Sequence, residues 1–242
     1  MSHKINGKNG EISYTCTNLG SDSNYYNNKD AYGLFLEMNR IAAYKKLLEN
    51  NNISSYDTII DVGCSWGAWY NTYNTLFNKP KIIGIEQYEK VAKQAEKLYD
   101  KVYIKSIEDL DNIEEKGLIC CNGMLVHILE EEEELKILKK MKELAKGSHI
   151  CCAVLNCNNY GPNMPNIWYG PNSKAQTLDY YYNLFKKANL KIIDQVGTFI
   201  YPINEKGNKL PESMFPSYFK LAEEKRRNNE IKNFAEIQFL LK

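Results

Sequence analysis

The chain has 242 residues, in which 31 basic residues nearly balance 30 acidic ones and leave a formal net charge of +1. This balance excludes the strongly basic surface typical of proteins that bind nucleic acid or anionic lipid. The length suits one large domain with a sizeable core. No apolar run approaches the roughly 18 residues of a membrane span, and residues 1–4 lack a secretory signal pattern, so we expect a cytoplasmic protein.

The cysteines are odd in number, and four of the seven form the adjacent pairs Cys120-Cys121 and Cys151-Cys152 inside apolar runs. Neighbouring residues of a strand point to opposite faces of a sheet, so we expect these pairs to be small buried side chains. No Cys-x-x-Cys motif occurs, and the three histidines are scattered. The spacing therefore predicts no bound metal.

Residues 1–30 are rich in Asn, Ser and Gly and have no apolar periodicity, which predicts an arm or lid ahead of the main domain (31–242). From Ala31 to Leu48, apolar residues recur at three- and four-residue spacing. This pattern predicts an amphipathic helix, with Asp30 as its cap and the asparagines at 50–52 as its end.

Short apolar runs then alternate with helical patterns. The predicted strands span 58–62, 81–85, 101–104, 118–121, 149–155, 191–196 and 236–241, and the predicted helices span 68–76, 89–99, 131–145 and 177–188. Such alternation favours right-handed crossovers and a doubly wound, parallel α/β sheet. Two insertions rich in Pro and aromatic residues, 156–173 and 201–234, are expected at the sheet's carboxyl edge.

The most informative segment joins the first strand to the helix after it. Asp61 is followed at alternate positions by Gly63, Ser65 and Gly67, with Cys64 between them. Glycines permit a tight turn and let a ligand approach the backbone amides at a helix N-terminus. The segment therefore predicts a ligand-binding turn.

An acidic residue strengthens this prediction. Glu86 comes 19 residues after Gly67, at the end of the second strand, and Gln87 follows it. Nucleoside-binding α/β folds place an acid at this point to bind the ribose hydroxyls. The two features together predict a nucleoside-containing ligand.

The pattern resembles the class I S-adenosylmethionine-dependent methyltransferases, whose first motif reads acid-x-Gly-x-Gly-x-Gly where this chain has Asp61, Gly63, Ser65 and Gly67. A carboxylate at Asp61 suits the ammonium of the methionine part and would repel a pyrophosphate. The resemblance covers residues 30–241. It implies a Rossmann-like, doubly wound seven-stranded sheet, mostly parallel with an antiparallel C-terminal strand, that binds S-adenosylmethionine and releases S-adenosylhomocysteine. A nicotinamide-dependent dehydrogenase remains an alternative.

The same resemblance implies further cofactor contacts. Ser106, Ile107 and Glu108 match the segment that holds adenine, and Asn122 matches the residue that lines the methionine end. Outside these motifs, Arg40 is expected to meet the carboxylate of the cofactor, and Tyr26 is expected to cover the cofactor.

His127 closes a stretch that looks like the fourth motif of a small-molecule branch of the family, the methyltransferase type 11/25-like branch. A side chain with an ordinary pKa of about 6.5 is suited to take a proton from an attacking hydroxyl. The alternative is a structural role, because methyl transfer can proceed by alignment of donor and acceptor alone.

The acceptor is expected to be a small molecule, with no nucleic acid or membrane involved. The insertions contribute aromatic residues that are expected to contact it: Tyr160, Trp168, Tyr169 and Tyr201. Eighteen tyrosines favour a neutral polar ligand such as a sugar or glycan precursor, methylated on oxygen. The alternatives are transfer to nitrogen or to a phosphate or phosphoramidate group, and a non-catalytic module that holds the cofactor. The oligomeric state stays open.

Overall fold

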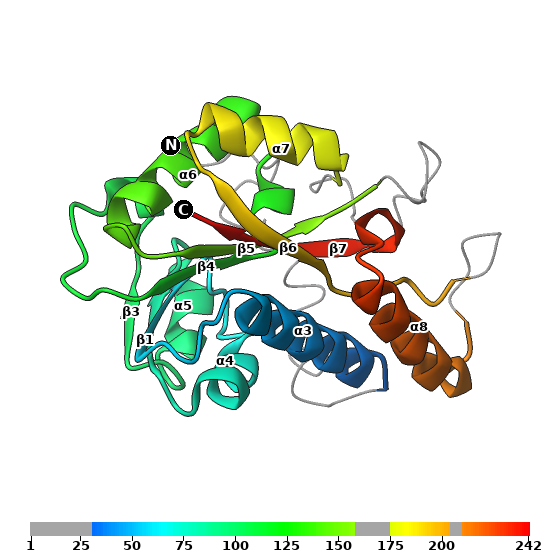
Figure 1. Cartoon of the computed structure of the whole chain (residues 1–242). Coiled ribbons are helices and arrows are strands. Elements are labelled where there is room, and N and C mark those ends of the chain that lie inside the picture. Colours follow the sequence, from blue (N-terminus) through cyan, green and yellow to red (C-terminus); the bar gives the residue numbers. More distant parts are fainter. Residues whose placement is uncertain (1–30, 158–174, 204–209) are drawn as a thin grey trace.

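The computed structural model describes residues 31–157, 175–203 and 210–242 (Figure 1). The predicted arm over 1–30, with Tyr26 and Asp30, lies outside these ranges. So do Tyr160, Trp168 and Tyr169.

A seven-stranded sheet in the order β3-β2-β1-β4-β5-β7-β6 forms the centre of the molecule. The strands are β1 (Thr58–Val62), β2 (Lys81–Ile85), β3 (Lys101–Tyr103), β4 (Leu118–Asn122), β5 (Ile150–Leu155), β6 (Ile192–Gly197) and β7 (Glu236–Leu241). Only β7 runs antiparallel to its neighbours β5 and β6. The predicted Rossmann-like sheet with one antiparallel C-terminal strand is confirmed.

Helices cover both faces of the sheet (Figure 1). On one face lie α3 (Ala31–Asn50), α4 (Tyr70–Phe77) and α5 (Glu89–Ala95), and on the other lie α6 (Glu131–Ala145) and α7 (Leu178–Lys187). Side chains alternate along a strand, so Ile59 of β1 packs in the cluster under α3 and α4, whereas Ile60 and Val62 pack in the cluster under α6 and α7.

The cysteine pairs are buried, as predicted. In the register of β4 and β5, Cys120 lies beside Cys151, and Cys121 lies beside Cys152. Each strand therefore contributes one thiol to each face of the sheet. Among the described residues, no three His, Cys, Asp or Glu side chains are grouped so as to hold a metal ion.

Helix α8 (Phe215–Arg227) was not predicted and lies inside the segment 201–234. Prolines made this segment look irregular, but Pro216 occupies the first turn of α8, where a missing N–H breaks no helical hydrogen bond. The helix packs beside α3 (Figure 1). The two helices enclose an aromatic cluster that includes Tyr32, Phe35 and Phe215.

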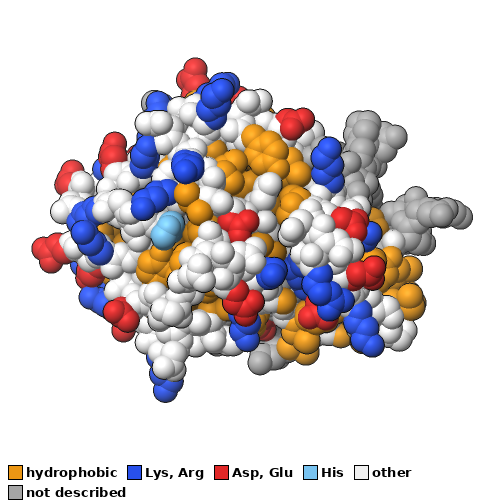
Figure 2. Space-filling model, viewed as in Figure 1, with side chains coloured by type: hydrophobic (Ala, Val, Ile, Leu, Met, Phe, Trp, Pro, Cys, Tyr) orange, Lys and Arg blue, Asp and Glu red, His pale blue; other side chains and the backbone are white. Residues whose placement is uncertain are grey.

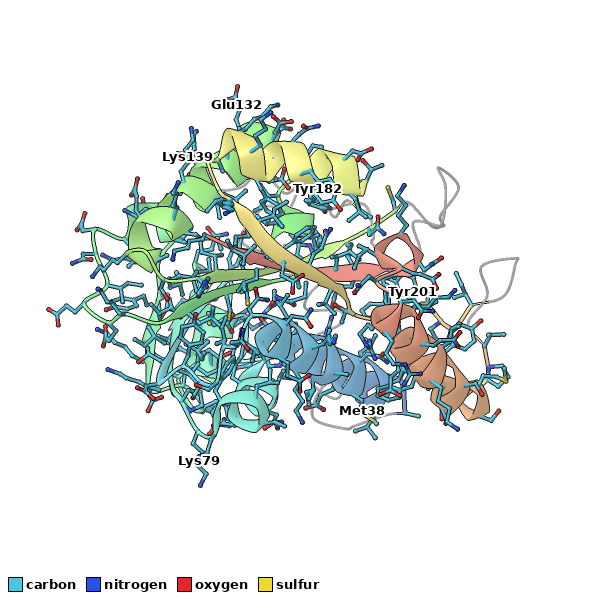
Figure 3. The ribbon with its side chains drawn as sticks, in the orientation of Figure 1. Met38, Lys79, Glu132, Lys139, Tyr182 and Tyr201 are labelled. Carbon is cyan, nitrogen blue, oxygen red and sulfur yellow. The ribbon has the colours of Figure 1, made fainter. Side chains whose placement is uncertain are left out.

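Helix α3 follows its predicted periodicity for most of its length. Phe35, Tyr44 and Leu47 are buried, whereas Leu34 and Met38 are exposed. Figure 3 shows Met38 on the side of α3 that points away from the sheet. The helix thus covers the sheet with one face and leaves two apolar residues on the other.

The visible surface carries charges of both signs, interspersed with neutral and apolar side chains (Figure 2). This agrees with the near-zero net charge of the chain. None of the helices in the described ranges is both long and apolar enough to cross a bilayer.

Candidate cofactor-binding site

The turn after β1 has the backbone that the glycine motif requires. Gly63, Ser65 and Gly67 all have positive φ angles, of 71°, 52° and 91°. Glycine adopts this left-handed region freely, whereas another L-residue loses about 1–2 kcal/mol there. Ser65 therefore departs from the motif in identity but keeps its conformation. Helix α4 starts at Tyr70, two residues later than predicted, because residues 64–70 complete two turns first, with Gly67 N–H donating to the Cys64 carbonyl.

The glycine turn packs closely against the side chains beneath it. A Cβ on Gly63 would lie 2.7 Å from the Met124 side chain, and one on Gly84 of β2 would lie 2.6 Å from the Cys64 sulfur. Gly123, at the end of β4, differs because a Cβ there meets nothing within 4 Å. The glycines thus allow close packing beneath the turn, while open space lies beside Gly123.

Glu86 follows β2 and lies directly beside the glycine turn. Its carboxylate accepts hydrogen bonds from the backbone N–H of Ser65 (3.0 Å) and of Tyr88 (2.9 Å). Burial raises the pKa of Glu86, and the N–H groups of Tyr88, Ser65 and Gln87 partly offset this effect. Gln87 itself is half-buried. The acid and the turn that the sequence placed 19 residues apart therefore meet in space.

Asp61, by contrast, is turned into the protein and is 1% exposed. Its two carboxylate oxygens accept hydrogen bonds from the hydroxyls of Tyr73 on α4 (2.9 Å) and Tyr99 after α5 (2.6 Å). Burial raises the pKa of Asp61 from 3.8 to about 7, although both tyrosine hydroxyls lower it. The nearby carboxylate of Glu86 adds to the rise.

The hydrogen bonds of Asp61 continue to the end of β4. Asn122 donates from Nδ2 to the Tyr73 hydroxyl (2.8 Å), and its Oδ1 accepts from Tyr44 (3.0 Å) and Gln238 (3.3 Å). Asn122 is half-buried, and its amide is held in one orientation by three elements. Asp61 and Asn122, which were predicted separately, belong to one buried polar network.

The segment expected at adenine forms a short 3-10 turn, η1 (Ile107–Asp109), beyond β3. Ser106 caps this turn by accepting a hydrogen bond from the Glu108 N–H (3.4 Å). Ile107 is buried in the cluster under α6 and α7, and Glu108 is half-buried. The three residues follow the carboxyl end of β3, and Glu86 follows the carboxyl end of the neighbouring strand β2.

His127 ends a second 3-10 turn, η2 (Leu125–His127), which follows β4. Its backbone N–H donates to the Met124 carbonyl (2.9 Å), and its side chain is half-buried. It therefore lies just past Gly123, on the same edge of the sheet as the glycine turn.

Arg40 lies on helix α3, which covers one face of the sheet. It forms a bidentate ion pair with Glu236, the first residue of β7, with Nε–Oε1 and Nη2–Oε2 distances of 3.2 and 2.9 Å. Its guanidinium also stacks on Trp69, 4.9 Å from the ring centroid. Trp69 directly precedes α4, so this contact brings Arg40 close to the glycine turn, and its role at the cofactor stays a prediction.

Tyr201 is the one predicted acceptor residue within the described ranges. It follows β6 and is 5% exposed, packed edge-on against Phe199 in the aromatic cluster beneath α3 and α8. Figure 3 places it close to the start of β7. Its ring is largely covered by the protein's own aromatic side chains.

The sequence interpretation missed several polar partners of the site, namely Tyr73, Tyr99, Gln238, Glu236 and Trp69. Each comes from a different helix, strand or connecting segment than its partner. No local motif marks them, and the only signal is their position near the end or start of a predicted element.

Comparisons with solved structures give one consistent result. The chain is similar to a methyltransferase from Clostridium acetobutylicum ATCC 824 (14% identity, 95% of this chain and 98% of that chain, TM-score 0.58). It is also similar to magnesium protoporphyrin IX methyltransferase from Synechocystis PCC 6803 with bound S-adenosylhomocysteine (10% identity, 95% of each chain, TM-score 0.61). A third similar structure is a possible histamine N-methyltransferase from Thermotoga maritima (14% identity, 93% and 94%, TM-score 0.59).

Sequence comparisons add nothing to this picture: no protein-family model matches the chain, and neither does any curated protein sequence. At these low identities the structural likeness establishes the architecture and not the reaction. The chain has the fold of the S-adenosylmethionine-dependent methyltransferases.

Proposed function

We propose that the chain is an S-adenosylmethionine-dependent methyltransferase that acts on a small molecule. The observation that carries this proposal is the contact between Glu86 and Ser65, because it joins an acid at the end of β2 to a left-handed, amide-lined turn at the end of β1. A nucleoside with a cationic amino-acid tail suits such a site better than a pyrophosphate does, since the Glu86 carboxylate lies beside the turn and the acidic side chain of Asp61 is buried behind it.

The residues at this corner fit that cofactor. Glu86 would bind the ribose hydroxyls, with the backbone of Gln87 beside it, and the segment from Ser106 to Glu108 would hold adenine. The open space at Gly123 leaves room for the methionine part between the turn and Asn122. Asp61 would act on the ammonium only through space and only in its ionised form, because both of its oxygens are already hydrogen-bonded to Tyr73 and Tyr99.

Bound S-adenosylmethionine supplies a methyl group already activated on a sulfonium. The protein then has to align the acceptor and exclude water, and alignment alone contributes up to about 7–11 kcal/mol in well-oriented systems. His127 lies just past Gly123, and in this proposal it would accept the proton that an acceptor hydroxyl loses. Its removal should lower turnover most at neutral pH.

For the acceptor we propose a sugar or glycan precursor methylated on oxygen. Support comes from the tyrosine-rich composition, since phenols both stack on sugar rings and hydrogen-bond to hydroxyls. The fold itself does not select the acceptor, as structures similar to this one include a plantazolicin methyltransferase as well as the magnesium protoporphyrin IX enzyme.

The test is transfer of labelled methyl from S-adenosylmethionine to a panel of nucleotide sugars, glycans, amines and peptides, read by product mass spectrometry. We expect methylated sugar with the wild-type protein and much less with Glu86→Gln at a subsaturating donor concentration. Label on amines or peptides alone would contradict the sugar assignment. Donor binding without transfer to any acceptor would contradict the enzyme and favour a binding module.

A further inference from the structure

Asn122 is the point at which a buried polar network reaches the candidate site. We propose that Asn122 binds the amino-acid carboxylate of the cofactor through a side-chain N–H, and that Tyr73 is the positioning residue that holds the amide in the orientation this contact requires. The inference rests on the proposed function and deepens it, because it assigns one group of the cofactor to one atom of the protein. No sequence pattern marked Tyr73.

The sheet fixes where the Asn122 amide lies. Asn122 ends β4, and Gln238 of β7 lies on the other side of β5. Both residues are in register with Ala153 of β5, so the three side chains lie on the same face of the sheet. The small side chain of Ala153 leaves room for Gln238 Nε2 to reach the amide oxygen of Asn122 (3.3 Å). The amide is therefore held from the β7 side.

The oxygen of the Asn122 amide is already used by the protein. Oδ1 accepts hydrogen bonds from the Tyr44 hydroxyl (3.0 Å) and from Gln238 Nε2 (3.3 Å), which occupy both of its lone pairs. Tyr44 and Gln238 are 0% and 1% exposed, so both donors are shielded from water. A ligand would therefore meet the nitrogen of Asn122 rather than its oxygen.

The nitrogen of the same amide keeps one N–H group for the site. Nδ2 donates one hydrogen bond to the Tyr73 hydroxyl (2.8 Å), and it has no second partner among the described residues. Tyr73 is buried, whereas Asn122 is half-buried. The next residue, Gly123, borders open space. The buried network thus ends in a hydrogen-bond donor at this space.

Tyr73 decides which end of the amide faces α4. If the amides of Asn122 and Gln238 both turned over, the bond between them would form again in the reverse direction, and the Tyr44 hydroxyl could accept instead of donate. The Tyr73 hydroxyl has no such freedom, because its one proton is donated to Asp61 (2.9 Å). Its oxygen can then only accept, so the nitrogen of Asn122 has to face it.

A hydrogen-bond donor selects one group of the methionine part of the cofactor. An ammonium only donates, whereas both oxygens of a carboxylate accept. The proposed function places the methionine part between the glycine turn and Asn122, and the carboxylate is the strong acceptor of that part. Asp61, buried behind the turn, favours the ammonium. Different residues would thus recognise the two charged groups.

The experiment compares S-adenosylhomocysteine with its decarboxylated analogue, which keeps the ammonium and lacks the carboxylate. Calorimetry at about pH 8, above the Asp61 pKa of about 7, keeps Asp61 ionised. The ratio of the two dissociation constants isolates the carboxylate, because effects on the adenosine and the ammonium cancel. For the wild-type protein we expect the analogue to bind at least about tenfold more weakly, the value of one hydrogen bond to a charged group.

Four variants separate the contact from its positioning. Asn122→Ala removes the donor and should lower the ratio about tenfold. Tyr73→Phe keeps the donor but frees the amide to turn over, and should lower the ratio about three- to tenfold. Tyr44→Phe removes an equally buried hydroxyl from the same amide but leaves the choice of orientation to Tyr73, so the ratio should fall less. Tyr56→Phe removes a hydroxyl that is hydrogen-bonded to His149 ahead of β1, and should keep the wild-type ratio.

Equal ratios in Tyr73→Phe and Tyr44→Phe would overturn the positioning role, since two merely structural hydroxyls would act alike. A wild-type ratio near one, or an unchanged ratio in Asn122→Ala, would overturn the carboxylate contact.

Substitutes exist for variants that do not fold. Asn122→Ser replaces Asn122→Ala, because its hydroxyl is too short to take the place of the amide nitrogen. Asp61→Asn replaces Tyr73→Phe, because an amide at 61 can donate to Tyr73 and so release the Tyr73 proton from its fixed direction. Failure of the wild-type protein to bind S-adenosylhomocysteine would instead overturn the proposed function itself.

Discussion

Two corners of the molecule bury polar groups in different ways. At the β1–β2 corner, Asp61 and Glu86 each have both oxygens satisfied, by tyrosine hydroxyls in one case and backbone N–H groups in the other. At the α3–α8 corner, the buried Arg226 donates to the Thr198 carbonyl and Asn39, while its Nη2 has no hydrogen-bond partner among the described residues.

The difference indicates what each corner is for. The first corner brings the acidic residues Asp61 and Glu86 next to the glycine turn and the open space at Gly123. We expect this arrangement to suit a cationic ligand. In the second corner, an arginine links α8 to the end of β6 among aromatic side chains, and burial lowers its pKa to about 10. We therefore expect substitutions in the first corner to alter ligand binding and those in the second to alter stability alone.

The largest expected effect is a loss of stability on substitution of Asp61, where an Ala and an Asn variant distinguish loss of the hydrogen bonds from loss of the charge. Asp61→Ala removes the acceptor of two buried hydroxyls and should lower the free energy of unfolding by about 2–6 kcal/mol, at about 1–3 kcal/mol for each unsatisfied group. Asp61→Asn keeps an oxygen and a similar shape and should cost far less. Denaturant titration of both variants measures the difference, and equal losses would contradict the network.

The raised pKa of Asp61 gives this corner a dependence on pH. The folded protein holds the Asp61 proton up to about pH 7, whereas the unfolded chain releases it near 3.8. The Asp61 contribution to stability therefore falls as pH rises between these values, by about 1.4 kcal/mol per unit. Relative to Asp61→Asn, the wild-type protein should lose stability from pH 4.5 to 7.5. A constant difference across this range would show that Asp61 is charged throughout.

A smaller effect, of about 1.5–3 kcal/mol, is expected in ligand affinity at Glu86. In Glu86→Gln the amide can accept only one of the two backbone hydrogen bonds and loses the charge-assisted bonds to a ribose. Binding of S-adenosylhomocysteine should weaken by about 10- to 150-fold in calorimetry. Glu89→Gln, on the exposed start of α5, is the matched control and should bind as the wild type does.

The second corner should respond in stability only. Arg226→Met removes the hydrogen bonds to Thr198 and Asn39 but also a buried charge, so the net cost should be about 1–2 kcal/mol of unfolding free energy. Affinity for S-adenosylhomocysteine should stay unchanged. Normal stability together with weakened binding of S-adenosylhomocysteine in Arg226→Met would contradict the proposed difference between the two corners.

The smallest effect is expected at Ser65. Ser65→Gly relieves a left-handed backbone at φ 52° and should stabilise the folded protein by no more than about 1 kcal/mol, because the unfolded chain gains freedom as well. Thermal unfolding measures it. Destabilisation would mean that the serine hydroxyl contributes more than its backbone costs.

The sequence predicted the first corner better than the second because its signals are local. Asp61, the glycine turn and Glu86 fall within 26 consecutive residues, and strand-turn-helix geometry fixes their meeting. The tyrosine partners of Asp61 could not be predicted, since nothing in a helical pattern says which hydroxyl turns inward. The pairing of Arg40 with Glu236, and of Arg226 with Asn39, depends on how α3, α8 and β7 pack.

One pair of titrations tests the central claim, that the β1–β2 corner recognises S-adenosylmethionine. Calorimetry of the wild-type protein should show S-adenosylhomocysteine binding at one site and no heat with NAD. At a hundred times its dissociation constant, S-adenosylhomocysteine should also raise the stability of the fold by about 2.7 kcal/mol. Binding of NAD, with no response to S-adenosylhomocysteine, would contradict the account.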